Sequence, residues 1–366
     1  MKFSVLKETI LDELQLLQGI VEKRNTMPIL ANILMTVGDG RVEMVGTDLE
    51  VGLKTSVEAN IEEPGAITVS GKKIFEIVKS LPDGQEVNFR ENDDLMMEIT
   101  AGKSEFKILC LPKEDFPQVQ AGAFERQITL PLGQIQEMID RVYFAIAQEQ
   151  RYYLNGALLI LKNGGVELVS TDGHRLSYTG STAENLVLDS EIRVIVAKKT
   201  LGELRKMVGE TVEFDQDENN LFFKIGSRVL ISRIIESKFP NFEAVIPKDN
   251  PHVLRVASSG FSQAIRRVSL LSTERSKGIK FSVDKDRLKL FSSNPEIGEA
   301  RDALDVEYGG VPLEVGFNSQ YVLDFLVSSA SERIRLELKD ENSAAVMKPD
   351  LDQDIRYTYV LMPMKI

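Results

Sequence analysis

The feature that most constrains the fold of this chain is an internal repeat that occurs three times. Residues 42–48 (VEMVGTD) recur as residues 166–172 (VELVSTD), and more loosely as residues 288–294 (LKLFSSN). Each copy follows a short turn rich in Gly, Asn or Asp, with alternating apolar residues on both sides. This pattern predicts a β-hairpin in each copy. A repeat with a period of about 120 residues requires three similar domains rather than one large core.

Other elements recur in the same order around each hairpin. Apolar residues at a spacing of three or four precede the hairpins and predict amphipathic helices over 6–21, 132–142 and 261–271. A short strand that leads into a second helix follows each hairpin, and further strands separated by polar turns complete the unit. Each repeat therefore reduces to a βαβββ unit used twice. We expect three α+β domains over residues 1–123, 124–249 and 250–366, with the pattern lapsing at 120–124 and 247–251.

Composition excludes several classes of protein. The chain has 366 residues, 44 basic and 56 acidic, and a net charge of −12, which argues against a broad basic surface for nucleic acid. No apolar run approaches the length of a membrane span, and the acidic start is unlike a signal peptide, so we expect a cytoplasmic protein. One cysteine, Cys110, and two histidines cannot form a disulfide or a metal centre rich in thiolate or imidazole ligands. We expect no cofactor and no metal.

The best candidate for enzymatic chemistry is the segment Ser170–Arg175, which contains Ser, Asp and His. Adjacent residues on a strand or turn point in different directions, so this spacing does not assemble a triad. The first repeat has Thr47 and Asp48 at the equivalent positions and no histidine. A strand-end turn capped by Asp is therefore favoured, and a hydrolase remains the alternative hypothesis. Gly71-Lys72-Lys73 lacks the preceding glycine that a phosphate-binding P-loop needs.

Basic residues recur on equivalent second helices of the first two repeats, at Lys72 and Lys73 and again at Lys198 and Lys199. Any one of these pairs fits an ordinary solvated face, but their recurrence in an acidic protein also fits a shared surface for phosphates. The C-terminal segment 359–366 is apolar to its end, where chains are usually polar. It is either an edge strand buried in its own domain or part of a binding surface.

Several short motifs together resemble the bacterial DNA polymerase III beta subunit, the family of sliding clamps. They run in order along the whole chain: MKF (1–3), PIL (28–30), GTDLE (46–50), RYYLNG (151–156), TDGHRL (171–176), KFP (238–240) and YVLMPM (359–364). The resemblance implies a non-enzymatic processivity factor with three domains per chain. It also implies a head-to-tail homodimer that forms a six-domain ring, with twelve helices around duplex DNA bound without regard to sequence.

The resemblance implies three sets of functional residues. A groove for partner peptides, from the replicative polymerase, the clamp loader and other proteins with a clamp-binding motif, would use Leu154, Thr171, Gly173, His174, Arg175, Leu176, Pro240, Val245, Val360, Met362, Pro363 and Met364. DNA would be contacted by Arg24, Lys72, Lys73, Gln148, Arg151, Tyr152, Tyr153, Lys198 and Lys199. The seam of the dimer that the resemblance implies would use Phe106, Ile108, Leu270 and Leu271, since strand alternation puts the first two on one face and the last two end a helix with apolar side chains.

Two positions depart from the family pattern. Ala244 stands where relatives often carry a basic side chain, and Ala345 stands where a serine is common. Both changes leave the groove apolar but could alter which peptide it prefers. A third hypothesis, a sequence-specific DNA-binding protein, predicts tight binding to a short linear duplex, whereas a clamp predicts very weak binding.

Overall fold

The structure is a computed structural model, and it describes residues 1–21, 27–92, 94–120, 122–124, 128–148, 152–274, 276–351 and 354–365, with the backbone alone for Tyr152. The chain divides into two compact units. The first contains Met1–Gln134 and Lys199–Ile234, and the second contains Ile135–Lys198 and Ile235–Ile366. The first and third repeats lie in different units, and the elements of the central repeat are shared between them.

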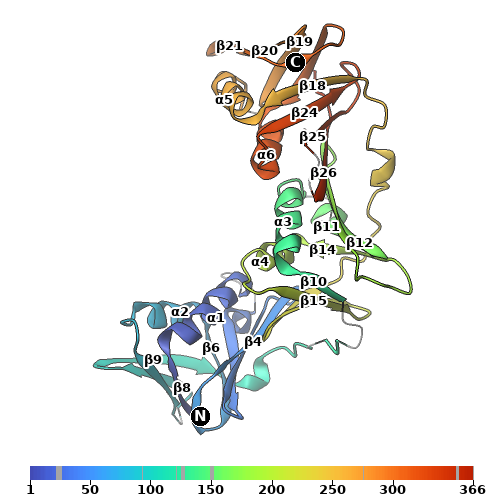
Figure 1. Ribbon diagram of the computed structural model, residues 1–366. Coiled ribbons are helices and arrows are strands. Elements are labelled where there is room, and N and C mark those ends of the chain that lie inside the picture. Colours follow the sequence, from blue (N-terminus) through green and yellow to red (C-terminus); the bar gives the residue numbers. More distant parts are fainter. Residues whose placement is uncertain are drawn as a thin grey trace. The chain divides into compact units, whose positions relative to one another are not determined.

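The first repeat begins with a strand and a helix, and then runs through a hairpin into a second helix (Figure 1). Its elements are β1 (Lys2–Leu6), α1 (Lys7–Ile20), the 3-10 turn η1 (Pro28–Ala31), β2 (Asn32–Gly38), β3 (Arg41–Thr47), β4 (Val51–Glu58), β5 (Asn60–Glu63), β6 (Gly65–Ser70), α2 (Gly71–Ser80), β7 (Glu86–Glu91), β8 (Met96–Ala101), β9 (Ser104–Leu111) and η2 (Lys113–Asp115). Helix α1 buries Ile10, Leu14 and Leu17, which confirms the predicted apolar face.

The central repeat has the same order of elements. They are β10 (Ile128–Pro131), α3 (Leu132–Tyr143), η3 (Tyr152–Leu154), β11 (Gly156–Lys162), β12 (Gly164–Thr171), β13 (Arg175–Ala183), β14 (Ile192–Ala197), α4 (Lys198–Leu204), β15 (Thr211–Gln216), β16 (Asn220–Ile225), β17 (Arg228–Arg233) and η4 (Phe242–Ala244).

The third repeat follows the same plan. Its elements are β18 (His252–Ala257), α5 (Ser258–Ser269), β19 (Gly278–Asp284), β20 (Arg287–Asn294), β21 (Gly298–Asp305), β22 (Glu307–Tyr308), β23 (Leu313–Asn318), α6 (Ser319–Ser329), β24 (Arg333–Leu338), β25 (Ala345–Pro349) and β26 (Ile355–Leu361). Helices α5 and α6 pack against a core that includes Phe261, Phe281 and Phe325. The βαβββ unit used twice is thus confirmed in each repeat, with short extra strands β5 and β22.

The hairpin turns form for local reasons. Asp39 and Gly40 adopt positive φ angles of 48° and 73° between β2 and β3, as a two-residue turn that matches strand twist requires. The equivalent turn between β19 and β20 has Asp286 at φ 60°. Short side chains that tolerate this conformation therefore mark the hairpins in the sequence.

Antiparallel sheets join successive repeats inside each unit. In the first unit one sheet has the order β10-β15-β16-β17-β4-β3-β2-β6-β9-β8-β7-β1-β5, so β17 of the central repeat pairs with β4 of the first. In the second unit a sheet has the order β14-β11-β12-β13-β26-β25-β24-β18-β22, so β26 of the third repeat pairs with β13 of the central one. A third sheet, β21-β20-β19-β23, belongs to the third repeat alone.

The position of β26 excludes one of the two alternatives for the apolar C-terminal segment, an edge strand. The C-terminal strand is not an edge strand, because it pairs with β13 along one side and β25 along the other. The apolar character of this segment follows from that central position, where Tyr359, Val360 and Leu361 are all buried.

Candidate partner groove and DNA-contact residues

The Thr171–Arg175 turn, which connects β12 to β13, is built by two side chains. Thr171 Oγ1 accepts the N–H of Gly173 at 3.1 Å and donates to the carbonyl of Arg175 at 2.6 Å. Asp172 Oδ1 accepts the N–H groups of His174 and Arg175 at 2.9 and 3.1 Å. Gly173 has φ +91°, a conformation that disfavours a side chain. The turn predicted from Asp as a local acceptor is confirmed.

The first repeat builds the same turn from Thr47 and Asp48. Thr47 Oγ1 accepts the N–H of Leu49 and donates to the carbonyl of Val51. Asp48 Oδ1 accepts the N–H groups of Glu50 and Val51 at 2.9 and 2.6 Å. The shared Thr-Asp sequence is therefore explained by turn geometry and needs no catalytic role.

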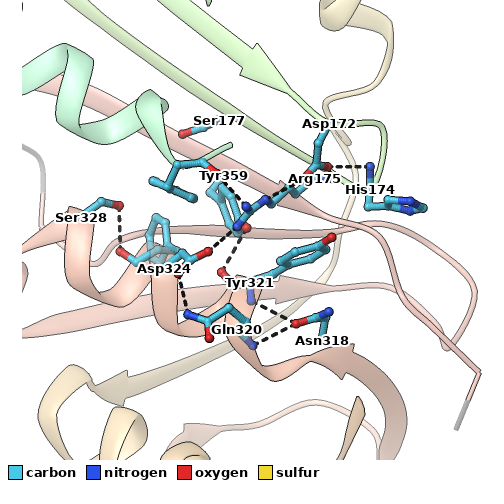
Figure 2. A network of polar contacts seen from close by, with 12 residues as sticks. Asp172, His174, Arg175, Ser177, Asn318, Gln320, Tyr321, Asp324, Ser328 and Tyr359 are labelled. Carbon is cyan, nitrogen blue, oxygen red and sulfur yellow. Dashed lines mark hydrogen bonds and ion pairs between the residues drawn. The ribbon is translucent and has the colours of Figure 1, made fainter. Parts of the chain in front are cut away.

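Arg175 is the centre of a polar network that joins the central and third repeats (Figure 2). Its Nε donates to Asp172 Oδ2 at 2.9 Å, and its two terminal nitrogens donate to Asp324 Oδ2 and to the carbonyl of Phe144, each at 2.6 Å. The guanidinium also lies 4.2 Å from the ring centroid of Tyr321. Because this side chain is only 10 % exposed, its charge is matched by two carboxylates rather than by water.

Burial controls the electrostatics around this network. It raises the pKa of the Tyr359 phenol well above its usual range, so the hydroxyl stays protonated and donates to the carbonyl of Tyr321 at 3.0 Å. Burial also lowers the pKa of Lys198, and the positive charge of Arg175 lowers it further. Lys198 Nζ donates to the carbonyl of Ile146 at 3.2 Å and lies 5.2 Å from the Tyr143 ring centroid.

Several predicted groove residues meet in one apolar cluster of the second unit. Leu176 and Val360 are opposite each other in the β13–β26 ladder, and both belong to a cluster with Phe242. Phe242 lies on the segment between Pro240 and Val245, both of which are exposed. The structure thus brings Leu176, Val360 and the segment 240–245 together.

The remaining groove residues lie on either side of this cluster. The N–H of Met362 donates to the carbonyl of His174 at 3.0 Å, and the N–H of Met364 donates to the carbonyl of Gly316 at 2.9 Å. Met362 is 44 % exposed, whereas Pro363 and Met364 are half-buried. Leu154 is buried, and its carbonyl accepts the N–H of Ala147. Of the two departures, Ala244 is exposed beside Val245, and Ala345 is buried in the third-repeat core.

The hydrolase hypothesis receives no support from this geometry. Ser170 is fully buried, and its hydroxyl donates to the carbonyl of Val142 at 2.6 Å. His174 is exposed, and Figure 2 shows its imidazole pointing away from Arg175. Among the residues that the structure describes, no group of three or more His, Cys, Asp or Glu side chains could hold a metal ion. No helix among them is long and apolar enough to cross a membrane.

The predicted DNA-contact residues differ in how accessible they are. Lys72 and Lys73 lie in the first turn of α2, are 63 % and 61 % exposed, and share Glu76 as an ion-pair partner. Gln148 is exposed and Tyr153 is half-buried. Lys199 is half-buried and donates to Asp48 and to the carbonyl of Ile20. Arg24, Arg151 and the side chain of Tyr152 lie outside the described residues.

The contact of Lys199 belongs to a junction between the first and central repeats. At the same junction Arg228 donates to Glu13, whose carboxylate also accepts the hydroxyl of Thr55. Glu13 is only 8 % exposed in its side chain, so this ion pair is largely shielded from solvent. Asp48 thus binds a lysine of the next repeat, whereas the equivalent Asp172 binds Arg175 of its own turn, and Arg175 makes the contact to the next repeat through Asp324.

The residues predicted for the dimer seam lie at a strand and a helix end. Phe106 and Ile108 are half-buried on one face of β9. Leu270 caps α5 and is 77 % exposed, and Leu271 beside it is half-buried. These four residues thus include one exposed and three half-buried apolar side chains.

Two residues of α6 contact Arg175 but were not among the residues predicted from the sequence, namely Tyr321 and Asp324. The prediction also missed Phe242, whose ring stacks on that of Tyr178 at 6.0 Å between centroids. No charge pattern in the sequence marks Asp324, because it lies in the middle of α6, whereas Lys199 of the equivalent helix lies in the first turn of α4.

Comparison with known proteins shows similarity along the whole chain. Family models described as the N-terminal, central and C-terminal domains of the DNA polymerase III beta subunit match residues 1–120, 129–241 and 243–365. The beta sliding clamp of Pseudomonas putida is 34 % identical over all of both chains. A crystal structure of the DNA polymerase III subunit beta from Pseudomonas aeruginosa is 34 % identical, with a TM-score of 0.94 over all of both chains. A sliding clamp from Bartonella birtlesii bound to griselimycin is 35 % identical, with a TM-score of 0.95 over all of both chains.

Proposed function

This chain belongs to the DNA polymerase III beta subunit family, and we propose how its residues carry out the work of a sliding clamp. The protein is a processivity factor of DNA replication, whose partners are DNA and a DNA polymerase. The observation that carries the mechanism is that each internal junction between repeats continues a β-sheet from one repeat into the next. We divide the chain into clamp domains 1–123, 124–249 and 250–366 on this basis.

One strand edge in the first repeat and one in the third lack a partner strand among the described residues of a single chain. Among the described residues, β21 pairs only with β20, and β9 pairs with β6 only at Cys110 and Leu111. Both strands therefore present unpaired backbone groups, which a second chain can satisfy. Phe106 and Ile108 on β9 and Leu270 and Leu271 beside α5 supply apolar surface at the same seam. Two chains joined head to tail at two such seams make a closed six-domain ring.

DNA is held by enclosure in such a ring rather than by strong direct contacts. The chain carries a net charge of −12, and the two most accessible lysines of the proposed DNA surface, Lys72 and Lys73, already share Glu76. With Gln148, Tyr153 and Lys198, and with Arg24, Arg151 and Tyr152 carried over from the family, they provide weak contacts that do not depend on base sequence. Lys199 contributes less, because Asp48 binds it.

Partner proteins dock as short peptides on the apolar cluster around Leu176 and Val360. The exposed residues Val245, Pro240 and Met362 surround this cluster and supply apolar surface for anchor side chains. One wall of the groove is formed by Thr171, Gly173, His174 and Arg175. The remaining groove residues are Leu154, Pro363 and Met364. The replicative polymerase, the clamp loader and other proteins with a clamp-binding motif share this groove in the cytoplasm.

The enclosure mechanism is tested by loading the protein onto nicked circular DNA with its ATP-driven loader. Salt is then raised, and the DNA is cut once. Protein retained on the circle is expected to leave through the new ends, and blocking those ends should prevent its loss. Equal retention on linear DNA with open ends would show that direct contacts hold the protein on DNA, and it would refute the enclosure mechanism.

The groove is tested by Val245→Asp and Met362→Asp, because both side chains are exposed and their replacement should not disturb the core. A hot-spot contact commonly contributes about 2 kcal/mol or more, so each change should weaken a polymerase tail peptide about thirtyfold. Val187→Asp is the matched control, since Val187 is 83 % exposed and outside the proposed groove. Unchanged peptide affinity in both groove variants would place the groove elsewhere.

A further inference from the structure

The two internal junctions pair their strands in the same register. At the first junction Ile231 of β17 lies opposite Gly52 of β4. At the second junction Val360 of β26 lies opposite Leu176 of β13. Gly52 and Leu176 are equivalent, because each lies opposite the threonine of a Thr-Asp turn, Thr47 and Thr171 respectively. Ile231 and Val360 are equivalent as well, because the strand ladders that start four residues before α3 and α5 lead to Leu230 and Tyr359 respectively, the residues just before them. One rule of register therefore describes both junctions.

The third repeat has an equivalent position on its unpaired strand. Ser293 occupies the place of the turn threonine, and its ladder partner on β21 is Glu299. Glu299 thus corresponds to Gly52 and Leu176. Among the described residues no strand lies along the other edge of β21.

The first repeat has an equivalent position on β9. Its hairpin has the same two-residue connection as the β16–β17 hairpin, because Ala101 pairs with Ser104 as Ile225 pairs with Arg228. Counting from these pairs, Lys107 corresponds to Ile231. The outer edge of β9 at this position is unpaired, since β6 reaches only Cys110 and Leu111.

The common register places opposite charges across the seam. Lys107 falls opposite Glu299, and in an antiparallel pair Glu105 then falls opposite Arg301. All four side chains lie on the exposed faces of their strands, with exposures of 53 %, 56 %, 56 % and 72 % for Lys107, Glu105, Glu299 and Arg301. Among the described residues of one chain, each basic residue forms ion pairs along its own strand or hairpin, at 3.0 Å for Lys107–Glu105 and for Arg301–Glu299.

The same charges disfavour the neighbouring registers. A slip of two residues, the smallest slip that keeps each side chain on its face, places Lys107 opposite Arg301 in one direction and Glu105 opposite Glu299 in the other. Like charges directly opposite each other destabilise a strand pair, and opposite charges stabilise it. The four residues therefore select one register out of three.

We propose that β9 of one copy pairs with β21 of a second copy in this register, and that the Lys107–Glu299 and Glu105–Arg301 pairs align the two chains. This rests on the proposed head-to-tail dimer and adds the feature that decides how its strands align. On the opposite face of the strands, Phe106 then lies over Ala300, so the apolar side of the seam depends on the same alignment.

Charge reversal at one pair tests the proposal. Lys107→Glu alone and Glu299→Lys alone should each raise the dimer dissociation constant by about tenfold at low salt, because each ring contains two seams. The double variant Lys107→Glu with Glu299→Lys should recover most of the loss. The control variant Lys107→Glu with Glu184→Lys has the same net charge as this double variant, but its new lysine is far along the chain from β21. Its dimer dissociation constant should therefore stay as high as that of Lys107→Glu alone.

Paired cysteines report the alignment itself. Residues directly opposite in an antiparallel ladder have Cα atoms about 4.5–5.5 Å apart, which suits a disulfide. Lys107→Cys with Glu299→Cys should therefore link two chains under mild oxidation, whereas Lys107→Cys with Arg301→Cys should not. Single-cysteine variants control for the native Cys110, which is buried.

The outcomes separate this proposal from the one on which it rests. A stable wild-type dimer that shows neither charge recovery nor the 107–299 link would overturn the alignment and leave the dimer intact. A link at 107–301 in place of 107–299 would show the slipped register and would also overturn it. A wild-type chain that is monomeric at micromolar concentration would refute the dimer and the alignment together.

Discussion

Replacing Arg175 with methionine should loosen the junction between the central and third repeats. Methionine keeps apolar contact with the Tyr321 ring but removes three hydrogen bonds, to Asp172, Asp324 and the carbonyl of Phe144. Removing one partner of a buried ion pair costs about 3–5 kcal/mol. The side chains of Asp172 and Asp324 are 18 % and 22 % exposed, so water compensates in part. We therefore expect the lower end of this range, about 3 kcal/mol.

Hydrogen exchange followed by mass spectrometry suits this test, because the chain has no tryptophan to report unfolding. A loss of about 3 kcal/mol corresponds to exchange about 150 times faster for amides that open with the junction. The effect should appear in α6, β13 and β26, and much less in β1 to β9. Peptide affinity should fall as well, since Arg175 supports the Thr171–Arg175 turn at the edge of the proposed groove.

Arg356→Met is the matched control for this prediction. Arg356 also lies on β26 but is 66 % exposed, with its carboxylate partner Glu167 at 3.6 Å. Exposed pairs contribute about 0–1 kcal/mol, so exchange should barely change. Equal exchange rates in α6 for Arg175→Met and the wild type would refute the argument that this buried network holds the two repeats together.

Three further changes have defined outcomes. Arg228→Met leaves the buried carboxylate of Glu13 with the Thr55 hydroxyl as its remaining described partner. The free energy of unfolding of the first unit, measured with urea, should therefore fall by about 3 kcal/mol, and Glu13→Gln in the same chain should restore part of the lost stability. Gly156→Ala should destabilise the β11–β14 pair, because the added Cβ would lie 2.3 Å from the carbonyl oxygen of Val196; thermal unfolding unchanged from the wild type would contradict this. Burial raises the pKa of Cys110 to about 11 from the ordinary 9.0, so at pH 8 its thiolate population is about a hundredfold lower than in the unfolded chain. A thiol reagent should therefore react slowly with folded protein and rapidly in denaturant, and a folded-state rate that matches the denatured one would show that Cys110 is accessible.

The repeat, the hairpins and the helices could be predicted from the sequence because they depend on neighbours a few residues away. Asp39 and Gly40 determine a turn through their own backbone preferences, and Leu14 and Leu17 mark the buried face of α1 through their spacing. The Thr-Asp turns are equally local, since Asp172 accepts N–H groups only two and three residues away. The order of these elements, repeated three times, was enough to determine the fold class.

The tertiary structure alone decided which remote residues meet. Lys199 has the sequence features of a phosphate contact, yet docking of the central repeat on the first places it against Asp48. Arg175 is one residue of a surface turn in the sequence, but α6 brings Asp324 to it from 149 residues away. The apolar C-terminus is equally ambiguous until β13 and β25 are seen on its two sides. A sequence pattern reports the periodicity that an element needs in order to bury one face, whereas the partner of a charged side chain depends on how two such elements dock.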